Sequence, residues 1–163
     1  MNASRAENKL FAIQKQRTEL VALVQSIKER YQARYHIGLI DFKGPEELFA
    51  AVDLHMLDTI LVNLIENAIK YGGTQQHISI QMEKLDRFVA LKISDEGPGI
   101  DPLERQHIFE KFYREHTGDL HNVKGHGLGL AYVKRILEDH NSEIMVESEK
   151  GKGSTFIIKV PLI

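Results

Sequence analysis

Two asparagines and a lysine recur at helical spacing in the segment 54–71, where they can share one face. At about 100° per residue, Asn63, Asn67 and Lys70 fall within roughly 60° of one another. Asparagine is a poor helix former, so this stripe is either a solvated face or a face that binds a ligand. On a ligand face, an amide oxygen suits Mg²⁺, Lys70 suits a phosphate, and Tyr71 offers an aromatic ring to a base. The apolar positions form a separate face: Leu54, Leu57, Leu61, Leu64, Ile65 and Ala68.

Two glycine-rich turns are further candidates for ligand binding. The segment 95–100, Asp-Glu-Gly-Pro-Gly-Ile, directly follows an expected strand. Its glycines allow the backbone to approach a ligand closely, and Asp95 can accept a hydrogen bond from an exocyclic amine. The segment 125–130, Gly-His-Gly-Leu-Gly-Leu, opens an expected helix, whose free N–H groups make an anion site. Each turn also has an ordinary structural reading, and the second matches neither a Rossmann nor a Walker fingerprint.

An aromatic segment, 108–114, lies between the two turns. Phe109 and Phe112 are most simply core anchors for the surrounding loop. Lys111 and Arg114 are either surface charges or cations within reach of a polyphosphate. The polar stretch that follows, 115–124, is long enough to act as a lid.

Composition narrows the class of protein. The chain has 163 residues, 42% of them hydrophobic, which fits one soluble globular domain. It has no cysteine, which excludes disulfides, thiolate metal sites and a cysteine nucleophile. With 21 Lys plus Arg against 23 Asp plus Glu, the net charge is −2, so nothing suggests general nucleic-acid binding. There is no apolar run of the ~18–20 residues that a membrane span needs, and no secretory signal is visible.

The elements that must position these residues follow from periodicity and capping. Asp53 is expected to cap the helix that carries the asparagines, and Gly72-Gly73 to end it. Hairpins dominate, so we predict a two-layer α/β sandwich: a mixed, mostly antiparallel sheet with helices on one face. The other expected elements are a short helix at 4–11, an extended stretch at 12–17, a helix from the cap Thr18 to Arg34, strands at 36–42, 48–52, 77–83 and 87–94, a short helix at 105–112, a helix at 128–139 closed by Asn141, and strands at 143–148 and 154–160.

Taken together, the motifs resemble the catalytic ATP-binding domain of bacterial sensor histidine kinases. The stretches 63–71, 95–100, 109–114 and 125–130 are similar to that family's asparagine box, first glycine box, phenylalanine box and second glycine box, in family order and spacing. The closing segment 151–156 is similar to the family's last strand pair. The resemblance covers roughly residues 18 to 163 and implies the Bergerat ATP-binding fold of the GHKL superfamily. ATP and Mg²⁺ are the implied cofactors.

The resemblance also implies roles for individual residues. Asn67 would be the main Mg²⁺ ligand, with Asn63 nearby, and Asp95 would accept a hydrogen bond from the adenine amine. The implied catalytic set is Asn63, Glu66, Lys70 and Arg114, although Glu66 lies about 60° off the stripe. The other implied nucleotide contacts are Tyr71, Gly97, Gly99, Ile100, Phe109, Lys111, Gly125, His126, Gly127, Leu128, Gly129, Leu130 and Thr155.

One position bears on the type of reaction. Hydrolytic members of the superfamily place a glutamate where Asn63 stands, as the base that activates water. An amide cannot take a proton, which favours a kinase. The resemblance therefore implies transfer of the ATP γ-phosphoryl group to a histidine. A non-catalytic nucleotide-sensing module and a GHKL ATPase of the same fold are the alternatives.

The family's phosphoacceptor is missing from this chain. None of its eight histidines lies in the acceptor context, and His126 stands where the family usually has a small residue. We therefore expect residues 1–16 to be a connector from an absent dimerisation hairpin and residues 17–163 to be the catalytic domain. The implied partners are that histidine-phosphoacceptor domain and, through it, a response regulator. Nucleic acid is not an expected partner, and no membrane contact is expected for this fragment. A cytoplasmic location is expected, and anchoring of the parent protein in the inner membrane is left open.

Overall fold

The computed structural model describes residues 13–35, 40–72, 77–113 and 129–162. The predicted short helix at 4–11 lies outside the described residues, as do the first residues of the strand predicted at 36–42. The elements are β1 (Lys15–Glu19), α1 (Leu20–Tyr35), β2 (Ile40–Lys43), β3 (Phe49–Asp53), α2 (Leu54–Gly72), β4 (Ile78–Lys84), β5 (Phe88–Asp95), α3 (Gly129–Asp139), β6 (Glu143–Glu149) and β7 (Gly153–Pro161).

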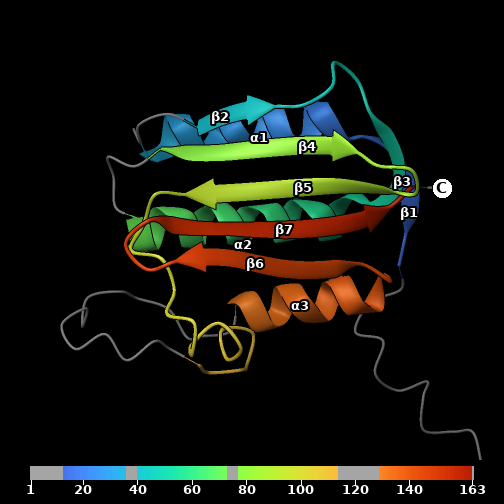
Figure 1. Ribbon diagram of the computed structural model, residues 1–163. Coiled ribbons are helices and arrows are strands. Elements are labelled where there is room, and N and C mark those ends of the chain that lie inside the picture. Colours follow the sequence, from blue (N-terminus) through green and yellow to red (C-terminus); the bar gives the residue numbers. More distant parts are fainter. Residues whose placement is uncertain (1–12, 36–39, 73–76, 114–128, 163) are drawn as a thin grey trace, which may run out of the picture.

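The strands form one five-stranded sheet and one separate pair. The order of the large sheet is β2-β4-β5-β7-β6, in which β2 and β4 run parallel and every other neighbouring pair is antiparallel. Strands β1 and β3 pair antiparallel beside it. The three helices cover one face of the large sheet (Figure 1). The predicted two-layer architecture is confirmed.

The core lies between the sheet and α2. Five of the six residues of the apolar face predicted for this helix are buried, with Leu57, Leu61 and Leu64 at most 1% exposed, whereas Leu54 is half-buried. Burying each such side chain stabilises the fold by about 1.5–3 kcal/mol. Along β5, Leu91 and Ile93 alternate into the same core, so the next inward position belongs to Asp95. The described helices include none that is long and apolar enough to cross a membrane.

The two long helices begin differently. Asp53 caps α2 as predicted, because its Oδ1 accepts a hydrogen bond from the Met56 N–H at 3.1 Å. For α1 the predicted cap, Thr18, is wrong: it lies in β1, and the Glu19 carboxylate accepts the N–H bonds of Val21 and Ala22 instead. Although burial acts to raise the pKa of Glu19, its three backbone hydrogen bonds hold that pKa below the usual value.

The segment 105–112, predicted as a short helix, is a series of turns. The N–H groups of Glu104, His107 and Glu110 each bond to the carbonyl three residues earlier, at 2.8–3.0 Å. The run ends at Phe112, whose φ of 65° is left-handed. So short a segment gains too few helical hydrogen bonds to offset the cost of nucleating a helix.

Candidate functional site

The predicted motifs meet at one end of the molecule. There, the carboxyl end of β5, the last turns of α2, the segment 96–113 and the start of α3 lie close together (Figure 1). Two close approaches join them. A Cβ atom on Gly97 would lie 3.4 Å from the Gly72 Cα at the end of α2, and one on Gly129 would lie 3.1 Å from the Asn63 Oδ1.

The asparagine face of α2 points toward the start of α3. The Asn63 Nδ2 donates a hydrogen bond to the Thr59 carbonyl at 2.8 Å, which leaves its Oδ1 directed at Gly129. Asn67, one turn further on, is half-buried. The Lys70 Nζ lies 5.0 Å from the centre of the Tyr71 ring, and Tyr71 is 47% exposed. All of these side chains are at least partly exposed, so they can meet a charged ligand.

Glu66 does not join this group. Its Oε1 accepts a hydrogen bond from the Tyr31 hydroxyl at 2.8 Å, which ties α2 to α1. Burial, followed by this bond and the charge of Glu66, raises the pKa of Tyr31 well above its usual value. The structure therefore places Glu66 in a helix–helix contact.

Asp95 is a partly buried carboxylate on the helix side of the sheet. Its Oδ1 accepts a hydrogen bond from the Gly97 N–H at 2.9 Å. Burial raises the pKa of Asp95 above its usual value, while the N–H groups of Gly97 and Ser154 act in the opposite direction. A side chain at Gly97 would lie 2.8 Å from the same oxygen, so glycine keeps the space beside the carboxylate open. Asp95 can accept a further hydrogen bond from a ligand there.

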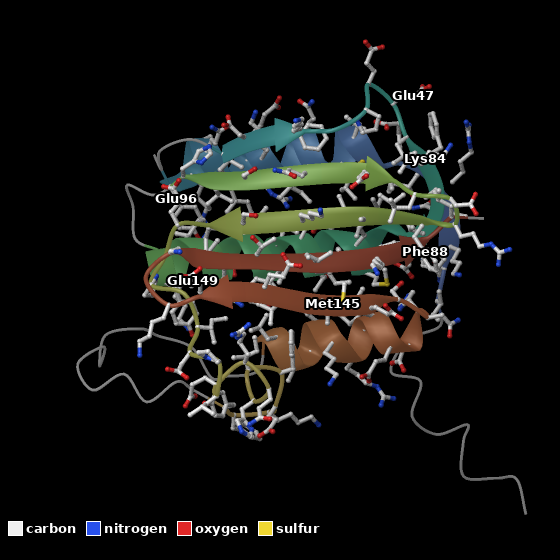
Figure 2. All side chains as sticks on the ribbon, in the orientation of Figure 1. Glu47, Lys84, Phe88, Glu96, Met145 and Glu149 are labelled. Atoms are coloured by element: carbon white, nitrogen blue, oxygen red, sulfur yellow. The ribbon has the colours of Figure 1, made fainter. Side chains whose placement is uncertain are left out.

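The last hairpin holds the turn that follows Asp95. The Ile100 N–H donates to the Ser148 Oγ at 2.8 Å, and the Gly151 N–H donates to the Pro98 carbonyl at 2.6 Å. Gly99 has a φ of +69°, and a Cβ there would lie 2.1 Å from the Glu149 carbonyl oxygen. In Figure 2, Glu149 and Glu96 lie at this same end of the sheet, whereas Lys84 and Phe88 lie at the other.

The sequence interpretation missed Ser148 and Ser154. The two are opposite one another in the β6–β7 register, and their Oγ atoms are 2.9 Å apart on the helix side. Thr155, predicted to contact the nucleotide, is on the opposite face, with its Oγ1 2.8 Å from the Ser94 Oγ. The structure therefore does not bring Thr155 together with Asp95. Strict alternation along β7, counted from the buried Phe156, would have identified Ser154.

The aromatic segment is anchored at only one of its two predicted positions. Phe109 packs edge to face against Phe156, with ring centres 6.5 Å apart, and Lys134 lies 5.9 Å above the Phe109 ring. Phe112 is 72% exposed, so its prediction as a core anchor is wrong. Because the segment is a run of turns, the spacing of three residues does not put both rings on one side. Lys111 is exposed.

The second glycine box is only partly described. Gly129 and Leu130 begin α3, and Leu130 packs against the core. The other predicted residues, Arg114, Gly125, His126, Gly127 and Leu128, lie outside the described residues, as does the predicted lid at 115–124.

A cavity of about 740 Å³ lies at the opposite end of α2 and α3. It is bordered by the start of α2, the end of α3 and residues 13–16, and it includes none of the predicted nucleotide contacts. Its polar lining comprises Gln14, Lys15, Gln16, Asp53, His55, Thr59, Tyr132, Arg135, Asp139 and His140.

The donor set fits a magnesium ion bound together with phosphate. Within the ranges 13–35, 40–72, 77–113 and 129–162, no three His, Asp or Glu side chains are grouped so as to hold a metal by themselves. Mg²⁺ usually needs only one or two protein oxygens when phosphate oxygens and water supply the others. The half-buried amide of Asn67, beside Asn63, can supply such an oxygen.

Comparison with known proteins identifies close relatives. Residues 52–163 match the family described as histidine kinase-, DNA gyrase B- and HSP90-like ATPase. Sensor protein RprX of Bacteroides fragilis is 39% identical over 137 residues, which are 83% of this chain and 26% of that protein. Sensor protein SrrB of Staphylococcus aureus is 34% identical over 163 residues, which are 99% of this chain and 28% of that protein. The chain thus spans about a quarter of the length of these curated relatives.

A solved structure shares the architecture. The nucleotide-free catalytic domain of histidine kinase ThkA superposes with a TM-score of 0.77 at 27% identity, covering 91% of this chain and 95% of that one. ThkA has also been solved in complex with response regulator protein TrrA, and this chain shares the fold of that kinase with a TM-score of 0.76 at 24% identity.

Proposed function

The chain belongs to the histidine kinase-, DNA gyrase B- and HSP90-like ATPase family, and we propose that it is the ATP-binding catalytic domain of a sensor histidine kinase. The observation that carries the proposal is the meeting of two separate motifs at one end of the fold. Asp95 and Gly97 lie against the end of α2, and the amide face of the same helix lies against the start of α3. A base acceptor and polar groups for phosphate therefore lie at the same end of the fold.

The two groups of residues suit different parts of ATP. The Asp95 carboxylate accepts a hydrogen bond from the adenine amine, and Tyr71 lies close to the base. Asn67, with Asn63 nearby, would hold Mg²⁺ by its amide oxygen, and Lys70 would contact the phosphates. Bound Mg²⁺ neutralises charge on the phosphate oxygens. These residues orient the triphosphate for attack in line.

The phosphoryl acceptor lies outside this chain. We infer that an imidazole on a histidine-phosphoacceptor dimerisation domain of the parent protein attacks the γ-phosphorus, and that a response regulator then receives the group. The N–P bond forms as the bond between the γ-phosphorus and the oxygen that leaves with ADP breaks. Asn63 cannot remove a proton from water, so little ATP is lost to hydrolysis.

Calorimetry with ATP and ADP, with and without Mg²⁺, tests nucleotide binding. We expect binding that depends on Mg²⁺ and phosphate release that is negligible in a parallel assay. Steady turnover near the ~10 s⁻¹ typical of enzymes would instead establish a hydrolase.

Phosphoryl transfer needs a second assay. The dimerisation hairpin of the parent protein is added in trans with γ-labelled ATP, and acid-labile label is expected on its histidine. Asn67→Ala is the matched negative control. Binding of ATP without transfer to the hairpin would favour a nucleotide-sensing module that has no catalytic role.

A further inference from the structure

The turn 96–100 is held in place by the last hairpin rather than by contacts within itself. The hairpin bonds to it at two points: the Gly151 N–H donates to the Pro98 carbonyl in the middle of the turn, and the Ser148 Oγ accepts the Ile100 N–H at its end. Lys150 adds an ion pair with Asp101 at 3.6 Å, although its side chain is largely exposed, so we assign it little energy.

Ser148 is the side chain on which this attachment depends. Its hydroxyl has one proton to donate and two lone pairs that accept. It donates to the Gly153 carbonyl at 2.9 Å and accepts from Ile100, and the Ser154 hydroxyl at 2.9 Å fills the remaining position. All of the hydroxyl's bonding capacity is therefore used within the protein, and none is left for a ligand.

The same hairpin also packs against the backbone of Asp95. Gly153 has a φ of +100°, and a Cβ there would lie 1.9 Å from the Asp95 carbonyl oxygen. The backbone of the hairpin therefore lies directly against Asp95, and Ser148 joins this backbone to the turn that follows Asp95. A shift of the turn relative to the hairpin moves the Gly97 N–H that fixes the carboxylate.

We propose that Ser148 is a positioning residue for the adenine end of the nucleotide site. Its hydroxyl keeps the turn 96–100 in the shape that binds adenine before the nucleotide arrives, without touching the nucleotide. The proposal rests on the function proposed above. It goes beyond that function because it places a determinant of base affinity on β6, outside all four boxes.

Ser148→Ala removes the acceptor and leaves the Ile100 N–H without its partner. The turn then samples other conformations, and the apparent Kd rises as the competent fraction falls. The net value of one hydrogen bond corresponds to about a 2- to 12-fold rise in the Kd for ADP. Ser148→Thr keeps the hydroxyl and is expected to restore most of the affinity.

The matched control is Ser94→Ala. This variant also loses a hydroxyl hydrogen bond within the same sheet, the 2.8 Å bond between the Ser94 Oγ and the Thr155 Oγ1. Ser94 adjoins Asp95 in sequence, but its side chain lies on the face of the sheet away from the helices. We expect its Kd for ADP to stay at the wild-type value. The melting temperature of each variant shows that it is folded.

Three measurements separate positioning from general loosening of the fold. The Kd for adenosine should rise with Ser148→Ala by the same factor as that for ADP, whereas the Kd for inorganic triphosphate with Mg²⁺ should not change. Hydrogen exchange at the Ile100 amide should accelerate in the same variant.

An unchanged Kd for ADP in Ser148→Ala, or an equal loss of triphosphate binding, overturns the positioning role while the proposed function stands. Failure of the wild-type chain to bind ADP overturns both, and it is seen before any variant is made.

Discussion

Asp95→Asn should weaken nucleotide binding and at the same time stabilise the empty protein. The substitution keeps the shape of the side chain and removes its charge. The amide oxygen can still accept the Gly97 N–H that Asp95 accepts at 2.9 Å, so the turn has no reason to rearrange. What changes is the other polar atom, which becomes an NH₂ donor and no longer accepts from the adenine amine.

The expected loss of affinity follows from the value of a hydrogen bond to a charged group, about 1.5–3 kcal/mol. ATP should therefore bind roughly 10- to 150-fold more weakly, at about 1.4 kcal/mol per tenfold. Guanine presents a carbonyl oxygen where adenine has its amine. The NH₂ of the variant's amide can donate to that oxygen, so the preference for ATP over GTP should narrow.

The effect on stability has the opposite sign. Burial raises the pKa of Asp95 above its unfolded value, even though the N–H groups of Gly97 and Ser154 act to lower it. A group with a raised folded pKa contributes stability below its unfolded pKa and loses that contribution as pH rises through the folded pKa. At neutral pH the ionised carboxylate therefore lowers the free energy of unfolding. The neutral amide should raise it.

Competition against a fluorescent ATP analogue measures both affinities, and denaturant unfolding without nucleotide measures stability at neutral and acidic pH. The stability gain should shrink as the pH falls and Asp95 takes up its proton. Asp86→Asn is the control, because Asp86 is exposed in the turn at the opposite end of β5. Unchanged ATP affinity in Asp95→Asn would show that the residue merely ends a strand.

Three further outcomes are expected. Asn67→Ala should abolish Mg²⁺-dependent nucleotide binding in calorimetry while changing the free energy of unfolding by only about ±0.5 kcal/mol, because the side chain lies off the buried face; a large fall in melting temperature would contradict this. Gly151→Ala should lower the free energy of unfolding by about 1–2 kcal/mol, because φ at Gly151 is +83° and nothing surrounds it. Gly153→Ala should lower it clearly more, because the added methyl group meets the Asp95 carbonyl oxygen on β5. Denaturant unfolding compares the two variants, and equal losses would refute the role of this steric contact. Tyr31→Phe should lower the free energy of unfolding by about 1 kcal/mol, because the hydrogen bond to Glu66 is lost. Because the pKa of Tyr31 is raised in the folded protein, wild-type stability should decline as pH rises above the pKa of an unfolded tyrosine. Ultraviolet titration should show one tyrosine that ionises at higher pH than the others.

The sequence was most informative where periodicity and capping agreed. Along α2 the apolar face, the amide face and the Asp53 cap each indicate the same helix, and the structure contains it from Leu54 to Gly72. The spacing of the four boxes then identified the family. The domain boundary at residue 17 stays a prediction, as do the ligand roles of the site residues, although β1 already begins at Lys15.

Local patterns were misleading where tertiary contacts decide the outcome. Thr18 is a better cap than Glu19 by propensity, but Glu19 also accepts the Leu48 N–H at 3.0 Å from the next segment of chain, which propensity cannot foresee. On β7 a shift of one residue exchanges the two faces of the sheet. The sequence interpretation selects Thr155, whereas Ser154 is the residue opposite Asp95 and on its face. Ser148 escaped notice because its partners lie on β7 and in the turn after β5.

The placement of Asp95 explains why we propose the nucleotide site at this end of the sheet. Strand β5 carries Leu91 and Ile93 into the core, and the alternation makes Asp95 the next inward residue. A carboxylate at the end of a core strand lowers stability unless a donor meets it, and the Gly97 and Ser154 N–H groups offset the burial only in part. A ligand amine would complete that offset. Stability alone would favour an amide at position 95, so the charge of Asp95 is most simply explained by ligand binding. Asp95→Asn tests this explanation, because it should raise the free energy of unfolding and weaken nucleotide binding at the same time.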